Sequence, residues 1–333
     1  MPIDTKNNFD LIRLFAALQV LTIHIAEHFG LPGFPDHLFF RMLSFIPGVP
    51  IFFFVSGYLI TASAERSKTL TSFFNNRALR IFPALWACLA VSLILVWSAG
   101  YFRTVEIPAD SLIGWIVAQT TFVQFFNPDF MRGYGVGVFN GSLWTISVEL
   151  QFYLLVPFIT LLVSRSRGAL VVSFLFFLAI NIWFTQVAKV SDQSETIAAK
   201  LFGITFAPWF AMFLLGAIFH YFSAKIVPVL RGKIAVFSFV YAIFIAGGIL
   251  AEDTLNLNIS SNFITPLHYI PLGFLILSAA YSSPTFSSKI LGKNDISYGL
   301  YIYHMPIVNF WLYMAFPVGV WGVFAATITI AAL

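Results

Sequence analysis

Apolar stretches of about 20 residues recur along the whole chain, and a helix of that length spans the hydrocarbon core of a bilayer. The chain is 59% hydrophobic and 10% charged, which leaves more apolar surface than a water-soluble domain could bury. The pattern predicts one all-α membrane domain over residues 1–333, with about ten spanning helices. They cover approximately 9–29, 42–63, 81–100, 143–164, 168–187, 201–222, 233–251, 263–282, 297–316 and 317–333.

Lysine and arginine are distributed unevenly among the loops. With ten spans and a cytoplasmic N-terminus, all 18 basic residues lie on the cytoplasmic side except Arg41, Arg103, Arg132, Lys189 and Lys200. This bias is the one that the positive-inside rule describes. We therefore expect a multi-pass protein of a bacterial inner (cell) membrane with both termini cytoplasmic. The shorter apolar stretch 110–126 is expected to form an interfacial or re-entrant helix.

Charge and cysteine content exclude several classes of function. The basic residues lie in short loops between apolar stretches, so the net charge of +4 does not indicate a nucleic-acid partner. Cys88 is the only cysteine, which excludes an internal disulfide framework and a cysteine-based metal cluster. The first apolar stretch is long and carries charge, so no cleavable signal peptide is expected.

That first stretch carries Asp10, Arg13 and His24. Ionisable side chains at bilayer depth are costly and usually functional. Eleven residues of helix bring Arg13 and His24 to the same face, about 16 Å apart, and Asp10 lies one turn before Arg13. The alternative is structural: an arginine that reaches the headgroups, and a histidine bonded to a neighbouring helix.

Two further motifs lie in the next spans. Ser56-Gly57 interrupts an apolar run, which favours close helix packing or a cavity lining. Arg77 and Arg80 are one turn apart at the cytoplasmic end of the third span. Guanidinium groups match phosphate oxygens, so this pair could hold an anionic substrate. Contact with anionic lipid is the simpler alternative.

The last two motifs surround a glutamate and a second histidine. Glu149 lies within the fourth span, and Trp144 precedes it where the outer interface is expected. The glycine-rich segment 133–141 before it indicates a mobile or close-packed external loop. Tyr301 and His304 lie in the ninth span, just before a proline that would kink it. Each motif could also be a structural polar cluster.

Taken in order, these five stretches resemble the acyltransferase 3 family, bacterial integral-membrane O-acyltransferases that modify surface sugars and related acceptors. The resemblance runs from about residue 8 to the end of the chain. Leu150 and the Thr145-Ile146 pair depart from the family pattern, and the first departure removes a second glutamate. The matching stretches are Asp10 to His24, Phe53 to Tyr58, Arg77 to Pro83, Trp144 to Tyr153 and Ser297 to Pro306.

The resemblance implies transfer of an acyl group, most simply acetyl from acetyl-CoA, to a hydroxyl of a glycan or lipid-linked sugar. A hydroxyl needs a base to remove its proton, and histidine suits that task near neutrality, so His24 is the expected base. Arg13, held by Asp10, would position the donor or stabilise charge. Glu149 would orient an imidazole or hold the acceptor.

The remaining expected roles are supporting ones. Arg77 and Arg80 would bind the phosphates of the acyl-CoA donor, which is cytoplasmic. Supporting contacts to substrate or structure are assigned to Ser56, Trp144, Tyr301 and His304. Direct transfer is favoured over a covalent route through Ser56. The resemblance implies no metal and no permanently bound cofactor; the expected partners are acyl-CoA, the acceptor and membrane lipid.

The same residues permit a non-enzymatic alternative. A secondary transporter of a sugar, lipid or anion could use His24, Glu149 and Arg13 as a relay. The two matching halves of many transporters are not evident here. For the enzyme, we expect one cavity from Arg77 and Arg80, past Arg13 and His24, toward Glu149 and the 133–141 loop.

Overall fold

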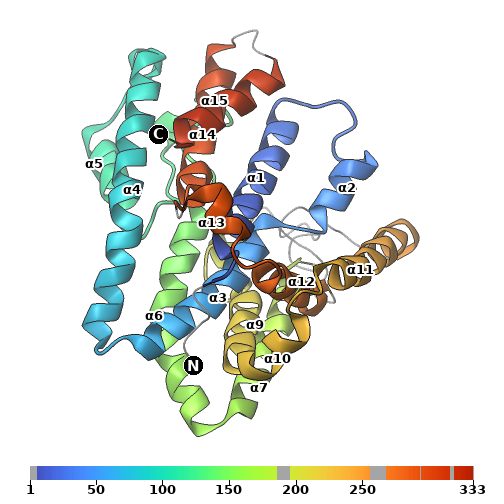
Figure 1. Cartoon of the computed structure of the whole chain (residues 1–333). Coiled ribbons are helices and arrows are strands. Elements are labelled where there is room, and N and C mark those ends of the chain that lie inside the picture. The colour runs from blue at the N-terminus through green and yellow to red at the C-terminus, as the bar shows by residue number, and fades with distance from the viewer. Residues whose placement is uncertain (1–5, 186–195, 256–267, 293, 316–318, 333) are drawn as a thin grey trace.

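The computed structural model describes residues 6–185, 196–255, 268–292, 294–315 and 319–332, and it contains helices and no strand in these ranges (Figure 1). Two short 3₁₀ helices, η1 (Tyr101–Arg103) and η2 (Asp129–Met131), accompany the α-helices. The all-α prediction is confirmed. The α-helices are α1 (Phe9–His28), α2 (Leu38–Ser44), α3 (Gly48–Arg66), α4 (Leu70–Ser98), α5 (Ala109–Thr120), α6 (Trp144–Arg165), α7 (Arg167–Trp183), α8 (Ile197–Gly203), α9 (Phe210–Tyr221), α10 (Ser223–Leu230), α11 (Ile234–Leu255), α12 (Tyr269–Tyr281), α13 (Phe286–Leu291), α14 (Ser297–Met314) and α15 (Val320–Ala332).

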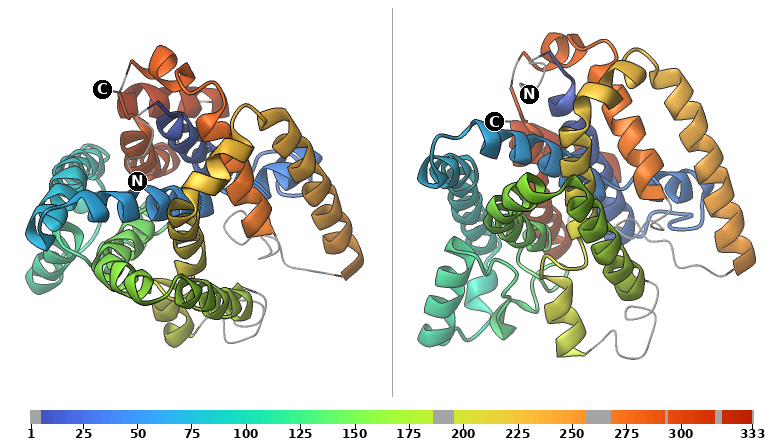
Figure 2. Two further views of the ribbon diagram at one scale, coloured as in Figure 1. Left: turned by 60° about the horizontal axis from the view of Figure 1, so that its bottom comes forward. Right: turned by 90° about the horizontal axis from the view of Figure 1, so that it is seen from below.

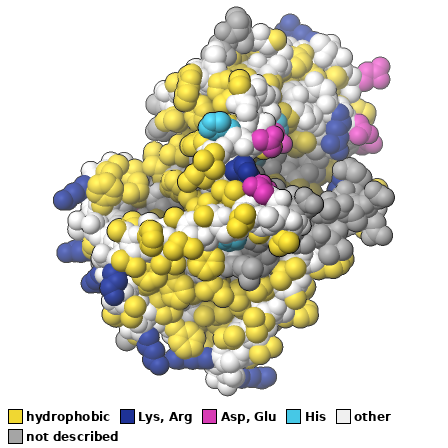
Figure 3. Space-filling model, turned by 90° about the vertical axis from the view of Figure 1, so that its right-hand side faces the viewer, with side chains coloured by type: hydrophobic (Ala, Val, Ile, Leu, Met, Phe, Trp, Pro, Cys, Tyr) yellow, Lys and Arg dark blue, Asp and Glu magenta, His cyan; other side chains and the backbone are white. Residues whose placement is uncertain are grey.

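Judged by helix length and composition, fewer segments could span a membrane than the ten expected. In the described ranges, five helical segments are long and apolar enough to cross a membrane, or six if the bent pair α9–α10 counts as one. Helices α7, α12 and most of α15 are apolar but shorter. The structure thus supports a helical membrane bundle without confirming ten crossings. Hydrophobic side chains cover much of the face drawn in Figure 3, as a lipid-facing surface requires.

Several expected spans are interrupted where the backbone breaks. The stretch 42–63 divides between α2 and α3, and Gln19 bonds both sides of the break, donating to Leu43 O at 3.3 Å and accepting from Gly48 N at 2.8 Å. The stretch 201–222 divides between α8 and α9, on either side of Pro208, which cannot donate a backbone hydrogen bond. Helices α9 and α10 meet at 89°.

Helix α3 lies at the centre of the bundle and packs on α1, α6 and α9 (Figures 1 and 2). Its contact with α9 is close because glycines face backbone on both sides. A Cβ at Gly57 would overlap the backbone of Phe213, and one at Gly216 would overlap that of Phe54. The close-packing interpretation of Ser56-Gly57 therefore holds for the glycine. Helix α14 packs on α1 and α4.

The segment between α4 and α6 forms a small apolar unit of its own. Trp115 of α5 is fully buried against Phe130 and Phe139, with ring centroids 5.5 and 4.8 Å away. The expected helix at 110–126 is thus shorter, ending at Thr120, and packs on the loop that follows it. The chain then returns to the centre of the bundle and enters α6 at Trp144.

Candidate functional site

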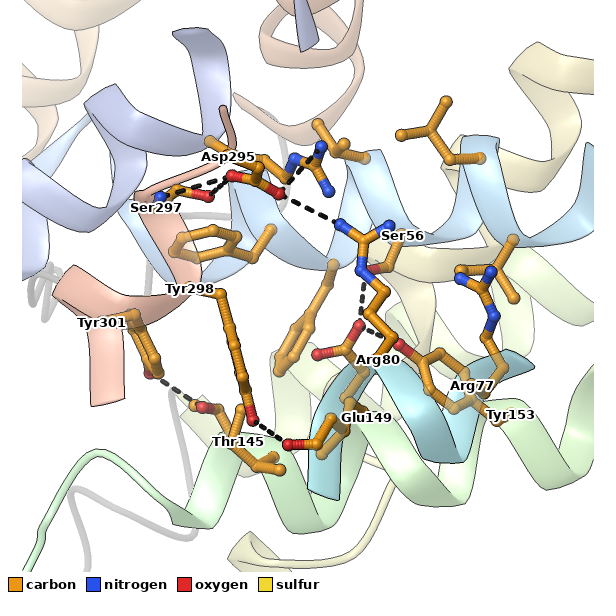
Figure 4. A pocket seen from close by; sticks show the side chains of 18 of the residues that line it. Ser56, Arg77, Arg80, Thr145, Glu149, Tyr153, Asp295, Ser297, Tyr298 and Tyr301 are labelled. Carbon is orange, nitrogen blue, oxygen red and sulfur yellow. Dashed lines mark hydrogen bonds and ion pairs between the residues drawn. The ribbon is translucent and has the colours of Figure 1, made fainter. Parts of the chain in front are cut away.

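A cavity of about 250 Å³ opens between α1, α3, α4, α6 and the start of α14 (Figure 4). Six of the expected site residues line it: Arg13, Ser56, Arg77, Arg80, Glu149 and Tyr301. Asp10, His24, Trp144 and His304 do not line it. The cavity therefore gathers motifs from five separate parts of the sequence, which is what a shared active site requires.

Asp295 joins two of the arginines in this cavity. Its Oδ2 lies 3.2 Å from Nη2 of Arg13 and 3.2 Å from Nη2 of Arg80. Its other oxygen accepts hydrogen bonds from the backbone N–H and the hydroxyl of Ser297, at the first turn of α14. Arg13 is also paired with Asp10, as the spacing predicted. One carboxylate thus connects α1, α4 and α14.

Sequence reasoning did not single out Asp295. The residue lies two positions before Ser297, where the matching C-terminal stretch begins, and a loop aspartate before a helix usually serves as a cap. The available signal was an acidic residue directly before one matching stretch, in a chain whose other matching stretches carry arginines. Its partners lie 282 and 215 positions away in the chain, and only the fold brings them together.

Glu149 lies deeper in the cavity and accepts two hydrogen bonds on one oxygen. Ser56 donates from α3 at 2.9 Å, and Tyr153 donates from one turn further along α6 at 2.5 Å. Arg77 lies beside the Tyr153 hydroxyl (Figure 4). Two donors and a nearby guanidinium satisfy the carboxylate in a partly buried position. Glu149 is therefore positioned as a fixed acceptor rather than a mobile surface group.

Tyr301 and Phe52 close the inner end of the cavity. The Tyr301 hydroxyl is 2.8 Å from the Thr145 hydroxyl, and its ring meets that of Phe52 at 5.1 Å. Beyond Tyr301 lies His304, with ring centroids 5.8 Å apart. The residues that line this cavity include neither His24 nor any residue of the 133–141 segment, so the expected continuous cavity is not seen in the described part of the chain. The ring of Tyr301 contacts that of His304, which in turn contacts His24.

His24 and His304 form a hydrogen-bonded pair beyond that wall. Nδ1 of His24 lies 2.8 Å from Nε2 of His304, and Nδ1 of His304 lies 2.6 Å from the carbonyl oxygen of Tyr301. A carbonyl can only accept, so in the neutral pair His304 carries its proton on Nδ1 and accepts on Nε2. His24 then donates from Nδ1, which leaves its Nε2 with a free lone pair.

The proline inside α14 explains why one of its backbone carbonyls takes partners from other parts of the chain. Pro306 has no N–H, so the carbonyl of Ile302 loses its helical partner. That carbonyl instead accepts from Asn140 Nδ2 at 2.9 Å and from the Cys88 thiol at 3.3 Å. Asn309, one turn further, accepts from Val136 N at 3.0 Å and donates to Val138 O at 2.8 Å.

These contacts position the glycine-rich segment 133–141 against α14. Gly135 has a φ of +55° and lies directly against the Asn309 side chain, leaving no room for a Cβ. The loop is therefore close-packed, one of the two possibilities that the glycines indicated. Trp144 is half-buried and meets the Trp209 ring at 5.0 Å, at the break before α9. Its expected position at the outer interface stays a prediction.

Comparison with known proteins assigns this chain to a family. The family model described as an acyltransferase domain, that of acyltransferase 3, matches residues 6–333. The chain belongs to the acyltransferase 3 family. It is therefore a membrane acyltransferase, as the ordered motifs implied. No solved structure matches the chain.

Three curated proteins show what this chain is similar to. The chain is 33% identical to nodulation protein 10 of Rhizobium leguminosarum bv. viciae, over 98% of this chain and 90% of the relative. It is 28% identical to an O-acetyl transferase of Shigella phage Sf6, over 91% and 84% of the two chains. It is 24% identical to the peptidoglycan O-acetyltransferase OatA of Listeria monocytogenes, over 91% of this chain but 49% of that longer protein.

Proposed function

We propose that this acyltransferase moves an acetyl group from cytoplasmic acetyl-CoA to a hydroxyl of a surface glycan or lipid-linked sugar. The family gives the reaction class, and the names of two relatives specify O-acetyl transfer, one of them to peptidoglycan. The observation that carries the proposal is the gathering of four arginines and a glutamate around one cavity, with a hydrogen-bonded histidine pair next to its Tyr301 wall.

His24 is the general base in this scheme. A sugar hydroxyl attacks the thioester carbonyl only as its proton leaves, and Nε2 of His24 is the nitrogen that the hydrogen-bond chain leaves free to accept it. The carbon–sulfur bond then breaks, and the proton held by His24 passes to the departing CoA sulfur. His304 acts through His24: it fixes the tautomer and the ring orientation but does not touch the substrate.

The arginines serve the donor. Arg13 of α1 and Arg77 and Arg80 of α4 all line the cavity, so phosphate oxygens that enter it meet guanidinium groups from two helices. Asp295 holds Arg13 and Arg80 in fixed orientations. Glu149 would hold the acceptor hydroxyls or orient them. Transfer is direct in this scheme. The Ser56 hydroxyl donates a hydrogen bond to Glu149, and the same carboxylate oxygen also accepts one from Tyr153, so it is a poor base for activating the serine.

The donor and the acceptor reach the site from different sides. Acetyl-CoA is made in the cytoplasm, and the positive-inside bias places Arg77 and Arg80 there, with both termini. The acceptor arrives from the outer side or from lipid, toward His24. The protein belongs in this scheme to the bacterial inner membrane, and the thioester must pass the Tyr301 ring to meet the acceptor.

The test is acetyl transfer by the purified protein in nanodiscs. Radiolabelled acetyl-CoA is supplied together with extracted membrane glycolipids, and labelled products are separated and identified by mass spectrometry. We expect label on a sugar hydroxyl with the wild type and background label with His24→Ala. Uptake of sugar or anion into proteoliposomes without acetyl transfer would instead support a transporter.

A further inference from the structure

A second hollow of about 470 Å³ lies at the end of α3 where the chain turns into α4. Residues 64, 65 and 67–70, at the turn between α3 and α4, form one wall, and Pro157, Thr160 and Ser164 of α6 form another. Tyr221 at the end of α9 closes a third side. None of its lining residues is shared with the cavity of Figure 4, and none has a role in the function proposed above.

The two spaces follow one another along the same three helices. On α6 the cavity ends at Tyr153 and the hollow begins at Pro157, four residues or one helical turn later. On α4 the corresponding residues are Arg77 and Phe73, again one turn apart. On α3, Arg66 lines the cavity, and the residues on either side of it line the hollow. The two spaces are therefore neighbours along α3, α4 and α6.

The size of the cavity indicates that its donor extends outside it. Sites for drug-sized ligands usually enclose about 300–1,000 Å³, and the cavity encloses about 250 Å³. Acyl-CoA is larger than most drugs and has two unlike ends, a narrow pantetheine arm and a bulky phosphorylated nucleoside. The cavity suits the narrow arm, and the nucleoside needs a second space beyond the arginines.

The hollow offers chemistry suited to that nucleoside. Lys68 lies on its rim and forms no ion pair within the described part of the chain. Thr69 caps α4 there, so the positive end of that helix dipole lies at the same rim. Tyr221, which is partly exposed, supplies an aromatic face for a base to contact. The carboxylate of Glu65 is occupied by His220 of α9, at 2.9 Å.

We propose that this hollow holds the 3′-phosphoadenosine end of the acyl-CoA donor, with Lys68 paired to its 3′-phosphate. The inference rests on the proposed function, because it extends the donor site of that reaction. The pantetheine diphosphate lies between Arg77 and Arg80, and the thioester lies toward Tyr301. Eight residues of α4 separate Thr69 from Arg77, about 12 Å of helix, a separation that an adenosine with its phosphates can bridge.

The test compares two donors that differ only in the nucleotide. S-acetyl-pantetheine carries the same thioester and arm as acetyl-CoA but lacks the phosphoadenosine. With Lys68→Ala, we expect the KM for acetyl-CoA to rise about tenfold, the effect of one charge-assisted contact, while turnover of S-acetyl-pantetheine stays unchanged. Lys68→Arg should retain most of the acetyl-CoA affinity. Lys225→Ala, which removes an exposed lysine of α10 outside the hollow, is the matched control.

A second part of the experiment measures ligand binding and does not depend on turnover. Adenosine 3′,5′-bisphosphate should bind the wild type and the Lys225→Ala variant in calorimetry, and binding should be lost in Lys68→Ala. Equal binding by all three, or an equal KM change for both donors, would overturn the assignment. A Lys68 effect that appears only in nanodiscs containing phosphatidylglycerol would assign the hollow to lipid headgroups instead. A wild type that neither binds CoA nor transfers acetyl would refute the proposed function itself.

Discussion

His24 and His304 face each other across α1 and α14, with Nδ1 of the first 2.8 Å from Nε2 of the second. The pair is anchored at one end by the carbonyl of Tyr301. The free nitrogen of the pair is therefore Nε2 of His24. This relationship specifies the tautomer of the proposed base, a histidine that helical spacing had selected.

The first prediction concerns this pair. His24→Ala should lower kcat by roughly 10²–10⁴-fold, the usual cost of losing a general base. His304→Leu should lower kcat by about tenfold with the KM of both substrates unchanged, because the orienting bond is lost. His304→Gln, whose carbonyl can still accept from His24, should recover part of that loss. Initial rates across pH separate the roles: a purely structural His304 would leave the shape of the kcat profile unaltered.

The second prediction concerns Asp295. Asp295→Asn should raise the KM for acetyl-CoA about tenfold and leave that for the acceptor unchanged, because Arg13 and Arg80 lose a shared anionic partner. Asp10→Asn removes a carboxylate from Arg13 alone and should have a smaller effect. Steady-state kinetics on both variants measure this. An equal change in both KM values would show that Asp295 supports the fold rather than the donor site.

A third prediction addresses Arg77 and Arg80. Arg77→Ala with Arg80→Ala should weaken the apparent affinity for acetyl-CoA more than that for the acceptor, because their guanidinium groups match phosphate oxygens. Competition with CoA in the presence of fixed acceptor provides the measurement. An unchanged donor KM in both single variants and in the double variant would favour contact with lipid.

The fourth prediction separates direct from covalent transfer. Ser56→Ala removes one of the two hydrogen bonds to Glu149, so activity should fall by no more than about tenfold. Tyr153→Phe removes the other and serves as the matched comparison. Complete loss of activity in Ser56→Ala, together with an acetylated Ser56 peptide trapped from the wild type by mass spectrometry, would establish the covalent route.

Local patterns in the sequence predicted most of the helices. The apolar runs at 143–164 and 233–251 correspond closely to α6 and α11, since each is continuous and has no interior break strong enough to end the helix. Hydropathy could not predict the breaks at 45–47 and at 204–209, because both are stabilised by contacts from distant residues. Gln19 of α1 holds the first break, and the indole N–H of Trp209 donates to Gly203 O across the second.

The site was predictable to a similar extent and for similar reasons. Spacing placed Asp10 beside Arg13, because one helical turn separates them. It could not place Asp295, whose partners lie on other helices, or the aromatic wall of Phe52 and Tyr301 between the cavity and His24. The residue type of Trp144 suggested an interface position, but it could not predict the contact with the Trp209 ring.

The carbonyl that Pro306 frees in α14 bears on how relatives can be recombined. Asn140 satisfies that carbonyl, and Asn309 of α14 bonds the backbone of the 133–141 segment in return. The 133–141 segment and the helix that carries His304 therefore depend on each other for partners. A chimera that grafts only this segment from a relative without the asparagine would leave the Ile302 carbonyl without its Asn140 donor. Parts of relatives should therefore be exchangeable only when this segment and α14 are transplanted together.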